Sequence, residues 1–121
     1  MHFDKFNGEA EQVAKRAAEL IQRFGHNQID TEHILLALIE PSDGTVSKII
    51  EGLRINVNEL EQKLENLLQN STRASIFSGS AGQIFITPRV KRILEVANEE
   101  STKLGVQFIG AEHLFLAILA E

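Results

Sequence analysis

One stretch near the start of this chain returns near its end. Residues 29–40 read IDTEHILLALIE, and residues 109–121 read IGAEHLFLAILAE, so the two copies lie 80 positions apart (109 − 29). The same offset pairs identical residues throughout the preceding segments as well: Ala17 with Ala97, Glu19 with Glu99, Gly25 with Gly105, Glu32 with Glu112, His33 with His113, Leu36 with Leu116 and Ala37 with Ala117. A series of matches at one fixed offset indicates an internal duplication. We therefore expect two copies of one structural unit, with function located where the copies agree.

The spacing of apolar residues predicts that this unit is helical. Over residues 8–24, apolar side chains recur every three or four positions, which is the pattern of an amphipathic helix with one buried face. Asn7 precedes this helix as an N-cap, because its side-chain oxygen can accept from free N–H groups of the first turn. Gly25 follows it in the place of a C-terminal glycine with left-handed backbone.

The same signals predict further helices over residues 31–40, 45–53, 57–69 and 88–104, and from residue 111 onward. Asp30 and Gly110 are the expected caps of the two matching short helices, since alanine at position 111 is a poor cap. Asn56 is expected to cap the fourth helix. Thr87 is expected to cap the fifth, with Pro88 at its first position, where a missing N–H has no cost. The fold class predicted is all-α.

A chain of 121 residues has the size of one domain. Within domain 1–121 we expect repeat one at 1–69, a mobile linker at 70–86 and a partial repeat two at 87–121. The fold is thus two pseudo-symmetric repeats of a four-helix unit, the second cut to about two helices. Either the chain is cut short, or another chain covers the surface that the two missing helices would cover. The last helix is apolar almost all round, which predicts self-association.

Composition argues against several classes of function. The formal charge is −5, Tyr and Trp are absent, and no basic stripe is present, so nucleic-acid binding is not expected. No apolar run is long enough for a membrane helix. The absence of cysteine excludes thiolate chemistry and disulfides, and fits a cytoplasmic location. The acidic balance mildly favours cationic partners such as basic peptides.

No nucleotide-binding loop or hydrolase motif is present, and we expect no catalytic residue and no cofactor. The repeated Glu-His pair raises the question of a metal site, but neighbouring residues on a helix point about 100° apart. Packing and hydrogen bonding are the expected roles of His33 and His113, and no metal is predicted. Glu32 and Glu112 lie beside helix N-termini, where a carboxylate could hold a guanidinium next to free N–H groups. The alternative, which the residues alone favour, is that they only complement the helix dipole, worth about 0.3–1 kcal/mol each.

These motifs resemble the N-terminal repeat domain of Clp AAA+ unfoldases. The resemblance rests on the matching segments GHN at 25–27, IDTEHILLAL at 29–38, TPR at 87–89 and IGAEHL at 109–114, together with the Phe6 opening. It covers nearly the whole chain, and its motifs look closer to the ClpC and ClpA types than to ClpB.

The resemblance implies a domain that receives substrates and adaptor proteins above an ATPase ring and holds no ATPase centre itself; the parent's motor would lie beyond residue 121. It also implies a phosphoarginine site in each repeat, with Glu32 and Glu112 as the guanidinium ligands. Thr87 is expected beside Glu112, and Asn7 beside Glu32. Asn7 and Ala111 depart from the threonines that are usual at those positions in the family. Two rival functions stay open: a ClpB-like disaggregase domain that binds unfolded segments, and a stand-alone accessory protein that regulates a Clp ring.

Overall fold

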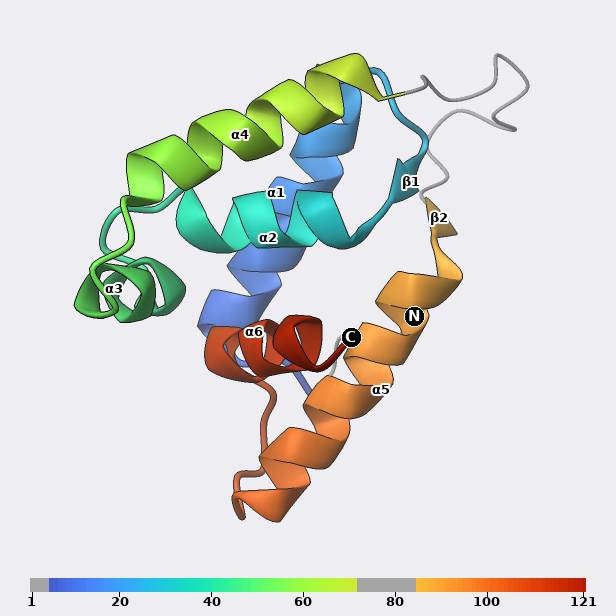
Figure 1. Cartoon of the computed structure of the whole chain (residues 1–121). Helices are drawn as coiled ribbons and strands as arrows, with labels where there is room; N and C mark the ends of the chain where they lie inside the picture. The colour runs from blue at the N-terminus through green and yellow to red at the C-terminus, as the bar shows by residue number, and fades with distance from the viewer. Residues whose placement is uncertain (1–4, 72–84) are drawn as a thin grey trace.

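The computed structural model describes residues 5–71 and 85–121 and contains six helices and two short strands in those ranges (Figure 1). The elements in chain order are α1 (Gly8–Arg23), β1 (Gln28–Ile29), α2 (Thr31–Ile39), α3 (Thr45–Gly52), α4 (Val57–Asn70), β2 (Phe85–Ile86), α5 (Pro88–Lys103) and α6 (Ala111–Ala120). The all-α prediction is confirmed.

The duplication read from the sequence is also visible in the helices. The long helices α1 and α5 have 16 residues each, and the short helices α2 and α6 begin 80 positions apart. The predicted caps Asn7, Asp30, Asn56, Thr87 and Gly110 all stand at helix starts. The left-handed glycine predicted after α1 has φ 73°, and its copy Gly105 has φ 72°.

Several helix ends differ from the prediction by one residue. α1, α2, α3 and α5 each end one residue earlier than expected, because the last expected residue serves as the C-cap, and α4 extends one residue further. The predicted division into repeats and linker stays a prediction, and residues 72–84 of the linker lie outside the described part of the chain.

The sequence analysis missed the strands, which pair the backbone of one repeat with that of the other. β1 pairs in parallel with β2, which places Ile29 opposite Ile86. A matching parallel bridge joins Ile109 to Phe6. The offset of 80 converts one pair into the other, since Ile29 corresponds to Ile109 and Phe6 to Ile86. Each repeat therefore contributes one strand to each contact, and the segment before a short helix always pairs with the segment before the other repeat's long helix.

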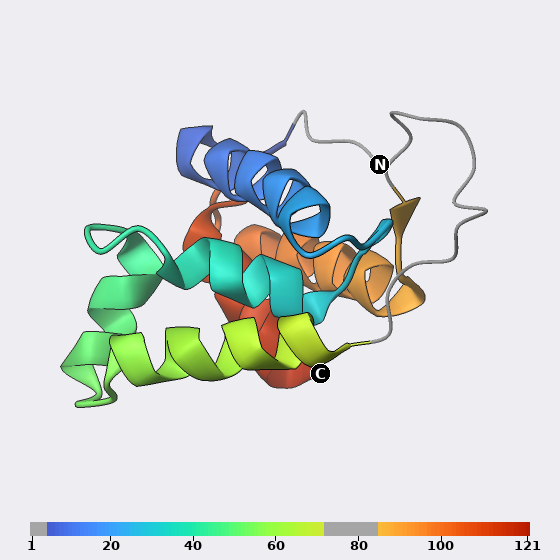
Figure 2. The ribbon, with the colours of Figure 1, turned by 90° about the horizontal axis from the view of Figure 1, so that it is seen from above.

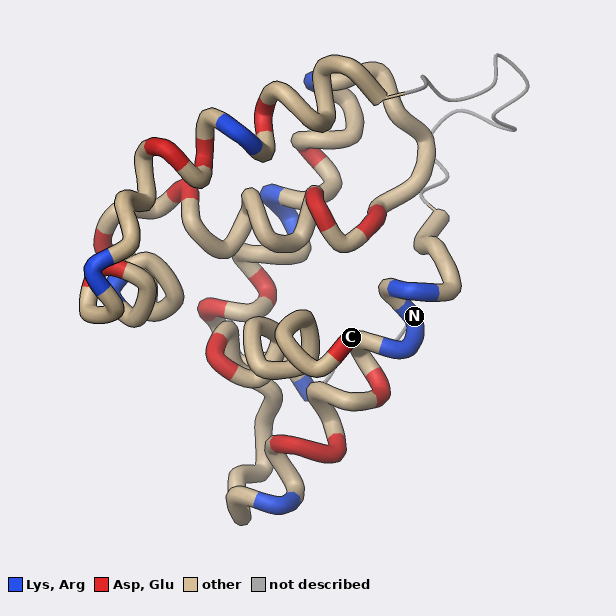
Figure 3. Tube along the Cα trace, in the orientation of Figure 1, with Lys and Arg blue, Asp and Glu red and all other residues tan. Residues whose placement is uncertain are grey.

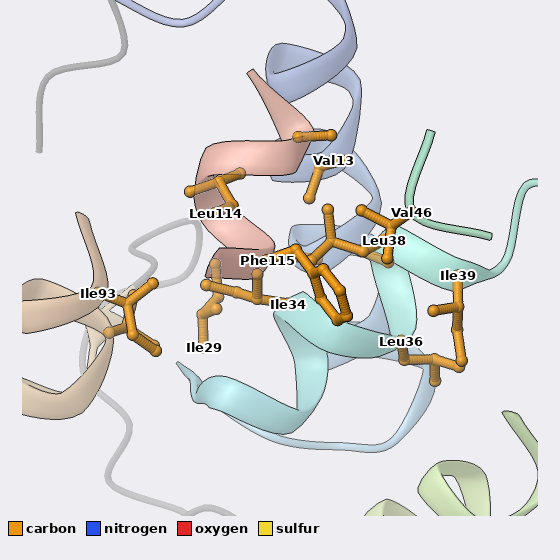
Figure 4. Close-up of a cluster of buried hydrophobic side chains, with 14 of the residues drawn as sticks. Val13, Ile29, Ile34, Leu36, Leu38, Ile39, Val46, Ile93, Leu114 and Phe115 are labelled. Carbon is orange, nitrogen blue, oxygen red and sulfur yellow. The ribbon is translucent and has the colours of Figure 1, made fainter. Parts of the chain in front are cut away.

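The core lies between the helices of the two repeats. Leu20, Leu36, Ile93 and Leu114, one from each of α1, α2, α5 and α6, are fully or almost fully buried. α6 packs against α5 and also contacts α1, α2 and α3. Seen from above, α6 lies behind α2 and α4 and next to α5 (Figure 2). In the close-up, Phe115 of α6 is drawn beside Ile34 and Leu38 of α2 (Figure 4), and Leu114 lines the same small opening as Ile34. Burial of these side chains is the main favourable term in holding the two repeats together.

α6 is covered on one face and open on another. Phe115 is buried, whereas Leu116 is 42% exposed and Leu119 is 65% exposed. Among the described helices, none has the length and apolar character needed to cross a bilayer.

Candidate binding corners

The parallel pairing of β1 with β2 brings the start of α5 to the start of α2, and we call this region the first corner. The backbone N–H of Thr87 donates to the carbonyl of Ile29 at 3.1 Å. The Thr87 hydroxyl donates to a carboxylate oxygen of Asp30 at 3.0 Å and accepts from the N–H of Val90 at 3.3 Å. Thr87 of repeat two thus forms a hydrogen bond to Asp30, the N-cap residue of α2 in repeat one.

The second corner is the symmetry-related meeting of α1 and α6. The backbone N–H of Asn7 donates to the carbonyl of Ile109 at 2.9 Å, and its side-chain oxygen accepts from the N–H of Ala10 at 2.9 Å. The side-chain nitrogen of Asn7 and the carboxylate of Glu112 both lie against the Cα of Gly110, where any larger residue would place its Cβ. The space that a capping side chain would fill is occupied by that carboxylate.

The structure corrects the expected pairing of the site residues. Thr87 lies in the corner of Glu32 and not beside Glu112, and Asn7 lies in the corner of Glu112 and not beside Glu32. The prediction was wrong because it assumed that each site is built within one repeat. The parallel strand pairs instead join the start of each long helix to the other repeat.

The two histidines of the repeated motif hold the helix starts in place. The N–H of Asp30 donates to Nδ1 of His33 at 2.9 Å, and the N–H of Gly110 donates to Nδ1 of His113 at 2.8 Å. Both side chains are buried, with 3% exposure each. This is the packing and hydrogen-bonding role that the sequence analysis expected, and it leaves the neighbouring glutamates as the outward-facing members of the motif.

His33 also contacts a second histidine. Its Nε2 lies 2.9 Å from Nδ1 of His26. Burial, followed by the nearby His26, lowers the pKa of His33 from its usual 6.5 to about 4, and the opposing effect of Asp30 is smaller. His33 is therefore neutral near pH 7.

The first corner opens into a hollow of about 140 Å³. It is lined by two acidic residues, two histidines and several other side chains: His26, Gln28, Asp30, Glu32, His33, Leu68, Ser71 and Thr87. Figure 3 shows acidic residues at the start of α2, opposite basic residues on the first turns of α5. The hollow is large enough for one side chain of a bound peptide.

Sequence reasoning found the glutamates but missed Asp30 and His26 as members of the site. A signal for both was present, since the offset of 80 pairs Asp30 with Gly110 and His26 with Val106. The positions where the copies differ, rather than those where they agree, distinguish the two corners.

This geometry defines an all-helical repeat domain with two related corners. Residues 5–121 match the family described as the Clp repeat (R) N-terminal domain. The chain belongs to this family.

Individual relatives agree with this assignment. The chain is 32% identical over 121 residues to the chaperone protein ClpB of Oceanobacillus iheyensis and 39% identical over 119 residues to the chloroplastic chaperone protein ClpC of Pisum sativum. These matches cover 100% and 98% of the chain but only 14% and 12% of the two relatives. A solved complex of a ClpV N-domain with a VipB peptide superposes with a TM-score of 0.80 at 19% identity, covering 98% of this chain and 70% of that one.

Proposed function

We propose that this chain is the substrate- and adaptor-binding domain of a Clp-type ATP-dependent protein unfoldase. The observation that carries the proposal is the pair of corners, in each of which a glutamate at a helix start faces a capping side chain of the other repeat. Family membership supports it, as does the peptide bound by the related ClpV N-domain. Weak binding at such a domain would raise the local concentration of substrate above an ATPase ring to which it is tethered. Unfolded or tagged proteins, adaptors and the parent's own AAA+ ring are the partners in this proposal, and a cytoplasmic location remains part of it.

The recognised tag, in this proposal, is phosphoarginine. Glu32 and Glu112 supply carboxylates for a guanidinium group, and Thr87 and Asn7 stand beside them, each from the opposite repeat. A ClpC- or ClpA-type parent fits this chemistry, although the ClpB relative matches the chain over its whole length too.

One observation favours a second function, binding of unfolded apolar segments as in a ClpB-like disaggregase. A small opening of about 30 Å³ between the repeats is lined only by apolar residues, among them Ala14, Ile34 and Leu94. Binding of an apolar unfolded peptide that is indifferent to changes at both glutamates would favour this alternative.

The proposal is tested by calorimetric titration of the chain with free phosphoarginine. We expect saturable heat for the unchanged protein and none for the double variant E32A/E112A, with the helical circular dichroism of the two proteins equal. A folded wild-type chain that gives no heat would refute phosphoarginine recognition, and loss of helix in the double variant would assign both glutamates to stability instead.

A further inference from the structure

The two corners offer different chemistry because different residues cap their short helices. At the first corner, the carboxylate of Asp30 accepts from the N–H of Thr31 at 2.8 Å and from the Thr87 hydroxyl at 3.0 Å. Two donors that an incoming anion could use, the Thr31 N–H and the Thr87 hydroxyl, are therefore already engaged by a resident anion. At the second corner, Gly110 brings no side chain to the same place.

The donors of the second corner are less occupied. Asn7 uses its side-chain oxygen to accept from Ala10, which turns its NH₂ group toward Gly110 and the Glu112 carboxylate. Among the described residues, that NH₂ group makes no hydrogen bond. A carboxylate for a guanidinium and an amide donor for a phosphoryl oxygen thus stand side by side.

The charges at the first corner also favour a cationic ligand over an anionic one. The lining of the first hollow contains two carboxylates, those of Asp30 and Glu32, and no Lys or Arg occurs among its lining residues. His33 is neutral there, and the basic residues Arg89 and Lys91 of α5 are exposed and do not line it. A guanidinium is attracted by both carboxylates, whereas the phosphoryl group of phosphoarginine would be repelled by both.

The two histidines of the first corner offer no accessible donor for a phosphoryl group. Because Asp30 N–H occupies Nδ1 of His33, the His33 proton is on Nε2 and points to Nδ1 of His26. His26 must then carry its own proton on Nε2, which is buried and has no partner among the described residues. With less than 1 Å² exposed, this N–H is not accessible to a ligand in the hollow.

We propose that the first corner binds an unphosphorylated arginine of a peptide, with the guanidinium on Asp30 and Glu32, and that phosphoarginine binds only at the second corner. This inference rests on the proposed function and divides it between the two corners. In this proposal, the protein binds an unmodified arginine at one corner and a phosphorylated arginine at the other.

The test uses two probes, N-acetyl-arginine amide and free phosphoarginine, with binding followed by amide chemical shifts of the full chain. We expect N-acetyl-arginine amide to shift residues of the first corner and to bind about tenfold or more weakly to E32Q, while E112Q leaves this binding unchanged. Phosphoarginine should show the opposite dependence. Loss of phosphoarginine binding in E32Q would overturn the division between corners and leave the proposed function standing. Absence of phosphoarginine binding at both corners would refute the proposed tag itself.

An exchange of the two capping residues should move phosphoarginine binding from the second corner to the first. D30G should let the first corner bind phosphoarginine in an E112Q background, because it removes the resident anion and glycine is an acceptable N-cap. G110D should abolish phosphoarginine binding, since its side chain would take the place of the Glu112 carboxylate. If D30G/E112Q fails to bind phosphoarginine while folding normally, Asp30 does not set the specificity and the proposal falls.

Discussion

The first and second corners come from one duplicated sequence, and both keep the glutamate and the buried histidine of that sequence. They differ at the cap, which is Asp30 in one and Gly110 in the other, and at the residue that crosses from the other repeat, which is Thr87 in one and Asn7 in the other. The shared residues close the helix start, since each histidine accepts from the backbone N–H of the capping residue. In our proposal, the residues that differ decide which ligand groups can bind. Duplication would then have copied the scaffold of a site while its specificity diverged.

The largest difference in the free energy of unfolding between matched variants of the two repeats is expected at a pair of corresponding leucines. Leu36 is fully buried, and its copy Leu116 is 42% exposed. We expect L36A to lower the free energy of unfolding by about 2–5 kcal/mol, because it removes buried methyl groups and leaves a cavity. L116A should cost less than about 1 kcal/mol. Urea denaturation of both variants measures the difference, and equal costs would mean that α6 is covered in solution in the same way as α2.

The buried histidine of the first corner should make stability depend on pH. His33 has its usual pKa of 6.5 when unfolded and a pKa of about 4 when folded, so between these values the unfolded state binds more protons. Stability should therefore fall as the pH is lowered from 6.5 to 4, by a total on the order of 3 kcal/mol. H33N keeps an acceptor for the Asp30 N–H without titrating in this range. The thermal unfolding midpoint of H33N should show a smaller loss across this interval, and an equal loss would assign the pH dependence to other groups.

Removal of the cap at the first corner should have a smaller effect. D30A loses the bonds to Thr31 and Thr87 and leaves donors of the first turn of α2 unsatisfied. We expect a loss of about 1 kcal/mol in the free energy of unfolding, and a loss of only a few tenths for D30G. Chemical denaturation compares the two. A larger loss for D30G would show that backbone freedom, and not the cap, dominates at this position.

The smallest effect on stability is expected at the open face of α6. Leu119 is 65% exposed, and L119K should change the free energy of unfolding by less than about 0.5 kcal/mol. The self-association predicted from the apolar character of this helix should nevertheless weaken, because the charge must be desolvated in any contact at that face. Sedimentation velocity over a range of concentrations checks this, and a wild-type chain that stays monomeric throughout would contradict the prediction.

Periodicity and capping chemistry were sufficient to predict the helices, because both are local. Asn7, Thr87 and Asp30 could be assigned as caps since an N-cap acts on the N–H groups of the next two or three residues. The offset of 80 made the starts of the two short helices comparable, and it identified Glu32 and Glu112 as matching carboxylates at those starts.

The partners across each corner could not be predicted in the same way. Two-residue strands carry too little alternation to be detected, yet the pairing of Ile29 with Ile86 and of Ile109 with Phe6 determines which long helix meets which short one. The link from Thr87 to Asp30 follows from that pairing.

Local sequence was therefore enough for the helices, their caps and the duplicated motif, because these depend on neighbours along the chain. The construction of each corner from both repeats became apparent only in the folded chain. Its contacts join residues far apart in sequence, such as Asp30 and Thr87 at a separation of 57 positions, and they depend on how the two copies pack around one core.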